Sequence, residues 1–147
     1  VTVWIGILEI STGRLTASNA GHEYPAVRRE NGKFELYKDK HGFVLAAMED
    51  MCYGEYEIDL RVGDTLFVYT DGVAEATNVE NTLYGTERML AALNQNEGAD
   101  PEELLRNVKK DIDVFVGKAS QFDDITMLAL KIKDIPSDRT GKMDVAL

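Results

Sequence analysis

The sequence predicts an α+β fold in which antiparallel strands form a sheet and two helices cover one face of it. Residues 1–70 hold short apolar or alternating segments separated by turn residues, a pattern typical of strands. Residues 86–94 and 101–116 carry apolar side chains at helical spacing, and residues 124–133 have the pattern of one more strand. Strands, then two helices, then a final strand is the order expected of α+β proteins with antiparallel sheets.

The first segments predict two hairpins. Residues 1–10 are apolar at both odd and even positions, which predicts a strand buried on both faces. Residues 11–13 form a turn, and residues 14–20 form the return strand. Asn31-Gly32, the strongest short hairpin signal in the sequence, joins the next two strands. The charged residues of this second hairpin predict a solvated edge, and they are Arg28, Arg29, Glu30, Lys33, Glu35 and Lys38.

A third pair of strands is predicted around a Gly-Asp turn. Residues 53–62 alternate between apolar and charged side chains, as in a strand with one face in solvent. Gly63-Asp64 then leads back into the apolar segment 65–70. We therefore expect these two strands to be antiparallel neighbours.

The second helix has clear start and stop signals. Asp100 can cap its N-terminus, and Pro101 suits its first turn. Glu103 stands at the capping-box position, and Gly117 is suited to end the helix. Its apolar stripe is expected to pack on the sheet.

Composition limits the function. The chain has 147 residues, a length that suits one domain with its own core. The formal net charge of −10 argues against nucleic-acid binding, which needs a basic face, and against contact with an anionic membrane surface. Cys52 is the sole cysteine, so no internal disulfide can form. A protein of the reducing cytoplasm is therefore expected.

The ends of the sequence suggest a piece of a longer protein. The chain begins at Val1 within a strand-like run, without a methionine, and it shows neither a signal peptide nor a membrane-spanning run. Residues 134–147 contain Pro136, Gly141 and scattered charges. We expect one domain at 1–133 followed by a flexible tail at 134–147.

Two acidic segments lie at the ends of predicted strands. The apolar run 66–69 ends at Asp71-Gly72, where glycine lets the chain turn sharply and leaves Asp71 projecting from the strand. An ordinary turn is the alternative reading of this pair. Asp123-Asp124 open the last strand. If the two strands are antiparallel neighbours, these carboxylates meet at one sheet edge. Their repulsion then calls for a cation such as Mg²⁺ or Mn²⁺.

Four motifs occur in the order typical of one enzyme family. They are Ala17-Ser18-Asn19-Ala20-Gly21-His22-x-x-Pro25, Tyr69-Thr70-Asp71-Gly72-Val73-x-Glu75-Ala76, Tyr84-Gly85-x-x-Arg88-Met89 and Asp123-Asp124-Ile125-Thr126. With this set, residues 1–133 resemble the C-terminal portion of the PP2C-type (PPM) protein phosphatases. The bacterial branch of sporulation stage II protein E and sigma-factor-regulation phosphatases is the most similar. The resemblance implies that family's sandwich of antiparallel β-sheets flanked by helices, here without its N-terminal part.

The resemblance also implies a chemistry. Family members use two or more Mg²⁺ or Mn²⁺ ions and an activated water, rather than a protein nucleophile, to hydrolyse phosphoserine or phosphothreonine. Asp71 and Asp123 match the metal-binding positions of the motifs. Asp124 and Gly72 are expected to support these ligands. His22 is expected to brace a loop near the site, with a catalytic role as the less favoured alternative.

One family motif has no counterpart. Members carry a Gly-Asp-aromatic-aromatic-Asp pattern in their N-terminal half, whereas the sole Gly-Asp pair here is the turn at Gly63-Asp64. We expect the parent protein to be a metal-dependent phosphatase and this fragment alone to be weakly active or inactive. The alternative is a catalytically degenerate PP2C-like domain that serves as a regulatory binding module.

The resemblance implies a phosphorylated protein as partner, in this branch an anti-sigma-factor antagonist in bacterial signalling. A half sandwich would expose a sheet edge and an apolar face, so a homodimer is also expected. Arg88 is expected to anchor its helix to the sheet. Glu75 either supports the metal ligands or is a solvated acid.

Overall fold

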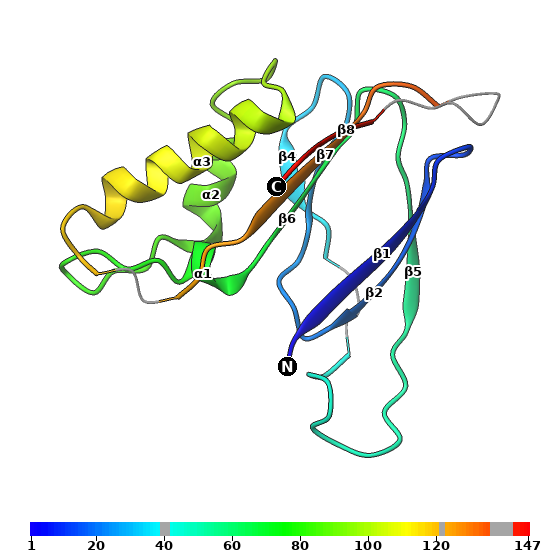
Figure 1. Ribbon diagram of the computed structural model, residues 1–147, viewed down its shortest axis with the longest axis horizontal. Coiled ribbons are helices and arrows are strands. Elements are labelled where there is room, and N and C mark those ends of the chain that lie inside the picture. Colours follow the sequence, from blue (N-terminus) through cyan, green and yellow to red (C-terminus); the bar gives the residue numbers. More distant parts are fainter. Residues whose placement is uncertain (39–41, 121–122, 136–142) are drawn as a thin grey trace.

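The computed structural model describes residues 1–38, 42–120, 123–135 and 143–147. It has three layers: helices, a five-stranded sheet and a three-stranded sheet (Figure 1). The predicted α+β class is confirmed. His41 lies outside the described residues. In the part of the chain that is described, no helix combines the length and the apolar character needed to cross a membrane.

Both sheets are antiparallel throughout. The smaller one has the order β1-β2-β5, with β1 at Val3–Glu9, β2 at Arg14–Ala20 and β5 at Glu55–Asp59. The larger one has the order β4-β3-β6-β7-β8. Its strands are β3 (Ala26–Arg28), β4 (Phe34–Leu36), β6 (Thr65–Tyr69), β7 (Met127–Ile132) and β8 (Met143–Ala146). The β3–β4 pair confirms the hairpin predicted from Asn31-Gly32, and Asn31 has the positive φ of 58° that such a turn requires.

Three helices follow β6: α1 (Asp71–Ala74), α2 (Gly85–Leu93) and α3 (Pro101–Val116). The predicted ends of α3 are confirmed. The Asp100 carboxylate accepts a hydrogen bond from the backbone N–H of Glu103 at 2.8 Å. At the other end Gly117 has φ of 60° and donates its N–H to the carbonyl of Asp113 at 3.0 Å.

Strand β6 is buried on both faces. Phe67 and Tyr69 belong to the core between the large sheet and the helices, where they join Met89, Leu93, Leu104, Val108 and Ile112. Leu66 belongs to a second core between the two sheets, together with Leu15, Ile58, Leu60 and Ile132. Two covered faces explain why 65–69 is a continuous apolar run rather than an alternating one.

The expected pairing of β5 with β6 is wrong, because the chain changes sheet at Gly63-Asp64. The Asp64 side chain is only 2% exposed. It accepts hydrogen bonds from the backbone N–H groups of Arg61 at 3.0 Å and Glu30 at 2.9 Å, and from the Arg29 guanidinium at 2.7 Å. A carboxylate with three donors stabilises a corner between sheets instead of a hairpin turn in solvent.

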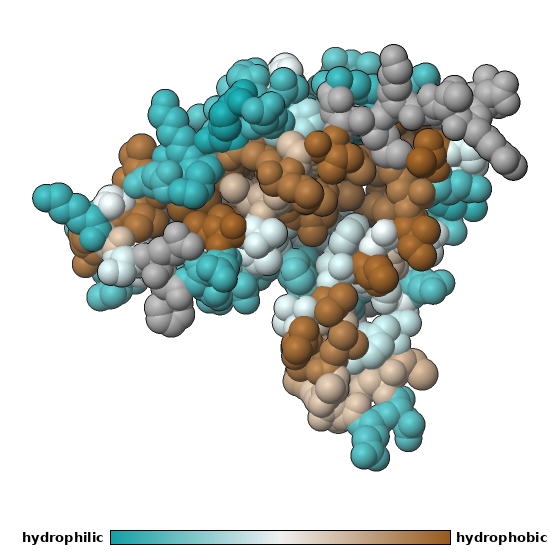
Figure 2. All heavy atoms as spheres, in the orientation of Figure 1, coloured by the Kyte–Doolittle hydropathy of each residue, from teal (hydrophilic) through white to brown (hydrophobic). Residues whose placement is uncertain are grey.

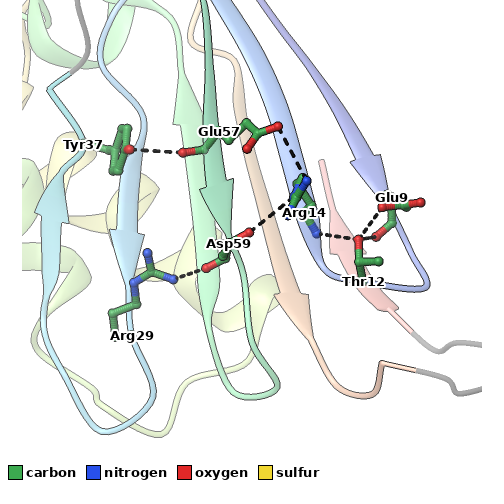
Figure 3. Close-up of polar contacts among 7 residues, drawn as sticks. All are labelled: Glu9, Thr12, Arg14, Arg29, Tyr37, Glu57 and Asp59. Atoms are coloured by element: carbon green, nitrogen blue, oxygen red, sulfur yellow. Dashed lines mark hydrogen bonds and ion pairs between the residues drawn. The ribbon is translucent and has the colours of Figure 1, made fainter.

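Polar contacts join the two sheets beside this corner (Figure 3). Arg29, which follows β3, donates to the backbone carbonyl of Asp59 in β5 at 2.5 Å. The Tyr37 hydroxyl donates to the carbonyl of Glu57 at 3.3 Å. Because these acceptors are backbone atoms of β5, they hold that strand opposite the β3–β4 hairpin.

The expectation that residues 1–10 are buried on both faces is also wrong. β1 is an edge strand among the described residues, and Ile7 is 70% exposed. Its neighbours Trp4 and Leu8 pack toward the core between the sheets, as alternate side chains must. Figure 2 shows hydrophobic atoms exposed over the lobe that contains β1. This face of the small sheet has no covering layer in the described part of the chain.

Arg28 departs from the expected solvated edge of the hairpin. It is 4% exposed and donates to the carbonyl of Glu97 at 2.9 Å, with its guanidinium 4.9 Å from the centre of the Phe34 ring. Burial lowers the pKa of Arg28, and the nearby Glu97 opposes that shift. The residue ties the loop between α2 and α3 to the sheet.

The expected flexible tail at 134–147 contains a strand. β8 pairs with β7, and Val145 lies opposite Leu130. The backbone of these C-terminal residues pairs with the edge of β7, although Val145 remains 53% exposed. Residues 136–142 lie outside the described residues, and the domain boundary at 133 stays a prediction.

Candidate functional site

The end of β6 and the start of β7 lie side by side. Tyr69 is the register partner of Met127. Beyond this pair the Thr70 N–H donates to the carbonyl of Thr126 at 3.0 Å. The Thr70 hydroxyl donates to the carbonyl of Asp124 and accepts from the N–H of Thr126, both at 3.1 Å. The strands that precede Asp71 and follow Asp123-Asp124 are therefore antiparallel neighbours, which is the condition set above for the two acidic segments to meet at one sheet edge.

Asp71 begins α1 instead of ending a sharp turn. Its carbonyl accepts from the N–H of Glu75 at 2.8 Å, which closes one helical turn. Its carboxylate is exposed and accepts from the N–H of Gly72 at 3.0 Å. The expected projection from a turn is thus replaced by a position in the first turn of a short helix, directly beyond the sheet.

Gly72 matters for space and not for an unusual φ. The sequence predicted a sharp turn that needs the conformational freedom of glycine, but the φ of Gly72 is not positive. A Cβ atom at this position would lie 2.4 Å from the carbonyl oxygen of Asp124. Glycine therefore allows α1 to approach the backbone of the Asp123-Asp124 segment closely.

Asp123 and Asp124 are exposed and precede the last strand, which begins at Met127 and not at the expected Asp124. The Asp123 carboxylate accepts from the N–H of Asp124 at 2.7 Å. Asp123 also lines a narrow cavity of about 40 Å³ together with Gly72 and Glu75. Apolar side chains of α3, among them Ile112 and Val116, form another wall of this cavity.

The Gly21-His22 corner is tied to the same end of the large sheet. Asn19 is buried, and its amide both donates to the carbonyl of His22 at 3.1 Å and accepts from its N–H at 2.8 Å. A nitrogen of the His22 ring lies 3.3 Å from the carbonyl of Glu23. The Tyr69 hydroxyl donates to the Glu23 carboxylate at 3.3 Å. Burial, followed by the charge of Glu23, raises the pKa of Tyr69.

Sequence reasoning did not single out Asn19 and Glu23. Asn19 belongs to the motif Ala17-Ser18-Asn19-Ala20-Gly21-His22-x-x-Pro25, so that motif could have indicated its importance. Glu23 carried none, because its contact with Tyr69 joins residues 46 positions apart. The supporting role of His22 stays a prediction.

Arg88 joins two helices rather than a helix and the sheet. Its Nε donates to Asp111 of α3 at 2.9 Å, and its guanidinium lies 4.7 Å from the centre of the Phe115 ring. The Tyr84 hydroxyl donates to the same carboxylate at 2.8 Å. The hydrogen bond from Arg88 is the main reason that the pKa of Asp111 is lowered. Arg88 is thus a structural residue of α2 and α3.

The available ligand atoms are carboxylate oxygens, the type that hard divalent cations prefer. Asp71 and Asp123 offer carboxylate oxygens at one end of a rigid sheet, and Mg²⁺ is usually bound by one or two carboxylates with water or phosphate completing the shell. In the described parts of the chain, no group of three or more histidine, cysteine or acidic side chains could hold a metal ion. The role of Asp71 and Asp123 as metal ligands stays a prediction.

Comparison with known proteins supports the family. Residues 1–133 match the model of the stage II sporulation protein E (SpoIIE) family. Protein IcfG of Synechocystis is 30% identical over 129 residues, which are 88% of this chain and 20% of IcfG. The phosphoserine phosphatase RsbU of Bacillus subtilis is 22% identical over 90% of this chain and 39% of RsbU. The chain thus spans about a fifth of the length of IcfG and about two fifths of the length of RsbU.

A solved structure shows the same fold. The phosphatase domain of SpoIIE from Bacillus subtilis, presoaked with manganese, superimposes with a TM-score of 0.71 at 14% identity, over 91% of this chain and 57% of that one. At this identity the match shows the fold alone, that of antiparallel sheets with few helices (Figure 1). The chain belongs to the SpoIIE family and forms part of a PP2C-type phosphatase domain.

Proposed function

We propose that this chain forms part of a metal-dependent phosphatase that hydrolyses phosphoserine or phosphothreonine in a protein. Asp71 and Asp123 are the proposed ligands of Mg²⁺ or Mn²⁺. The observation that carries the proposal is the hydrogen bonding of Thr70 to Asp124 and Thr126, which holds the two acidic segments at one sheet end. The names of the relatives support it, since RsbU is called a phosphoserine phosphatase and the SpoIIE domain was presoaked with manganese.

The chain's own residues supply position and charge. Two ionised carboxylates at one sheet end repel each other, and a divalent cation offsets that repulsion. When bound, such a cation makes water a nucleophile near neutral pH and stabilises the charge on a phosphoryl group. Asp124 and Gly72 keep the backbone of the two acidic segments close together. His22, at the corner beside Tyr69, is proposed to support the same end.

The isolated chain is proposed to be weakly active or inactive. Two carboxylates bind Mg²⁺ weakly, because this ion loses its waters reluctantly. The chain matches 57% of the SpoIIE phosphatase-domain structure, so the remainder of such a domain is the proposed source of further ligands. The proposed substrate is a phosphorylated anti-sigma-factor antagonist in bacterial sigma-factor regulation.

Calorimetric titration with Mn²⁺ tests the metal site. We expect the chain to bind Mn²⁺ weakly and the Asp71→Asn and Asp123→Asn variants to lose that binding. Asp59→Asn is the matched control, because it removes one exposed carboxylate on β5 in the other sheet. Equal binding by all four proteins would refute the assignment of Asp71 and Asp123.

Activity is tested on the full-length protein that contains this chain, with a phosphoserine peptide and Mn²⁺. We expect Asp71→Asn to lower kcat by at least a hundredfold and Asp59→Asn to leave it unchanged. A wild-type protein that binds phosphopeptide without hydrolysing it would identify a regulatory binding module instead.

A further inference from the structure

A groove opens beside the predicted metal end, and we name it the 77–83 groove. It has a volume of about 520 Å³ and is lined by Glu75, Thr77, Asn78, Val79, Asn81, Leu83, Ala119 and Ser120. Glu75, Thr77 and Ser120 also line the narrow cavity that reaches Gly72 and Asp123. The groove is therefore continuous with the end of the sheet where the acidic segments meet.

One wall of this groove is a well-ordered loop. Tyr84 donates its N–H to the carbonyl of Ala76 at 2.7 Å, and Asn78 donates to the carbonyl of Thr82 at 3.1 Å. Inside the loop the Asn78 side chain accepts from the N–H groups of Glu80 and Thr82, both at 3.0 Å. The buried Tyr84 fixes the base of the loop through its hydrogen bond to Asp111. The wall is thus set before anything binds to it.

Apolar side chains are exposed on this ordered wall. Val79 is 70% exposed and Leu83 is 58% exposed. An internally hydrogen-bonded loop does not need them for its own stability, and exposed apolar side chains that gather at a groove mark binding sites. A ligand that covers them gains hydrophobic free energy at little cost in loop ordering.

The groove is almost free of charge in a strongly acidic chain. The net charge is −10, yet among the eight described residues that line the groove Glu75 is the sole charged one. An acidic surface repels an anionic phosphoprotein, whereas a neutral wall of amide, hydroxyl and apolar groups does not. The groove therefore offers an approach to the acidic end that a phosphorylated partner can use.

We propose that the 77–83 groove binds the polypeptide segment next to the phosphorylated residue of the protein substrate, with one apolar side chain against Val79 and Leu83. The proposal rests on the phosphatase function proposed above. Continuity with the cavity at Asp123 favours a substrate segment over a second copy of this chain. A segment in the groove lies beside the position where its own phosphate would react.

The test is a leucine scan of a phosphoserine peptide, carried out on the full-length protein with Mn²⁺. The parent peptide is an eleven-residue Gly/Ser sequence with central phosphoserine, and leucine replaces each flanking position in turn. We expect leucine at one position to raise kcat/KM about tenfold, which corresponds to ~1.4 kcal/mol. This gain should disappear in Val79→Ser and Leu83→Ser.

Val114→Ser is the matched control, since Val114 is also 70% exposed but lies on α3 and is not among the residues that line the groove. The leucine gain should persist in this variant. The readout is the ratio of kcat/KM for the leucine peptide to that for the parent peptide, so a general loss of folded protein cancels.

Three results overturn the proposal. The first is a wild-type protein whose kcat/KM does not rise with leucine at any position of the peptide. The second is a leucine gain in kcat/KM that persists in both Val79→Ser and Leu83→Ser. The third is self-association that Val79→Ser abolishes, which would assign the groove to a second copy of the chain. Failure of the phosphatase function is distinguishable, because that protein would hydrolyse neither peptide nor p-nitrophenyl phosphate. A protein that hydrolyses p-nitrophenyl phosphate without any leucine gain retains the function and loses the docking site.

Discussion

Gly72→Ala tests whether close contact between α1 and the Asp123-Asp124 segment builds the candidate site. The new Cβ would stand 2.4 Å from the Asp124 carbonyl oxygen and 3.0 Å from its carbon, whereas ordinary contact begins near 3.4 Å. The contacted atoms are backbone, so rotation of a side chain cannot relieve the clash. The carbonyl must move by about 1 Å, the difference between 2.4 and 3.4 Å.

Two opposing effects set the magnitude. Alanine is favoured over glycine in a helix by at most about 1 kcal/mol. Overpacking of a tight contact costs roughly 1–3 kcal/mol, and the displaced Asp124 carbonyl also weakens its hydrogen bond with Thr70, worth about 0.5–1.5 kcal/mol. The free energy of unfolding should therefore fall by roughly 0.5–4.5 kcal/mol, and Mn²⁺ binding should weaken.

Urea denaturation and Mn²⁺ calorimetry measure the two effects. Gly54→Ala is the control, because within the described chain no heavy atom outside residue 54 and its two chain neighbours lies within 4 Å of the new Cβ, and the φ of Gly54 is not positive. That change should leave stability equal or slightly higher, since alanine restricts the unfolded chain. A Gly72→Ala protein as stable as the Gly54→Ala protein, with unchanged Mn²⁺ binding, would refute the reasoning.

Two further predictions concern α3 and the edge strand. Asp111→Asn should lower the free energy of unfolding by about 1 kcal/mol at neutral pH, because the carboxylate accepts charge-assisted hydrogen bonds. The pKa of Asp111 is lower in the native state than in the unfolded chain, where it is near 3.8. The contribution of Asp111 to stability is therefore complete above pH 3.8 and should vanish as the pH falls through the native pKa, which urea denaturation at several pH values measures. Asp113→Asn is the control: it removes an exposed pair with Lys109 and should lower the free energy of unfolding much less. We also propose that the isolated chain dimerises through β1, so that Ile7→Lys, but not Val114→Lys at equal exposure, gives a monomer in sedimentation. A monomeric wild-type chain at tens of micromolar would contradict that proposal.

The elements that the sequence predicted correctly depend on local chemistry. Asn31 adopts a positive φ within its own turn, and Asp100, Pro101 and Gly117 act at the two ends of α3, where they stand. Such signals lie within a few residues of their effect. The same holds for the acidic segments, whose strand ends are evident from the apolar runs beside them.

The incorrect expectations depended on distant contacts. Asp64 directs β5 and β6 into different sheets because it binds Arg29 and Glu30, more than 30 positions earlier. Arg28 is buried because Glu97, 69 positions away, supplies an acceptor. Gly72 was assigned the wrong physical reason, since the Asp124 carbonyl that excludes a Cβ comes from the distant segment that precedes β7. No local pattern specifies these partners.

The position of the candidate site follows from the burial of β6. A strand packed on both faces loses most of its freedom to shift, because each face has its own core. Thr70 extends that restraint beyond the strand through backbone and side-chain hydrogen bonds to the segment that leads into β7. The carboxylates can therefore be exposed to solvent while the backbone that bears them is held by the core. Phe67→Ala should thus reduce Mn²⁺ binding from a distance, although Phe67 bears no ligand atom.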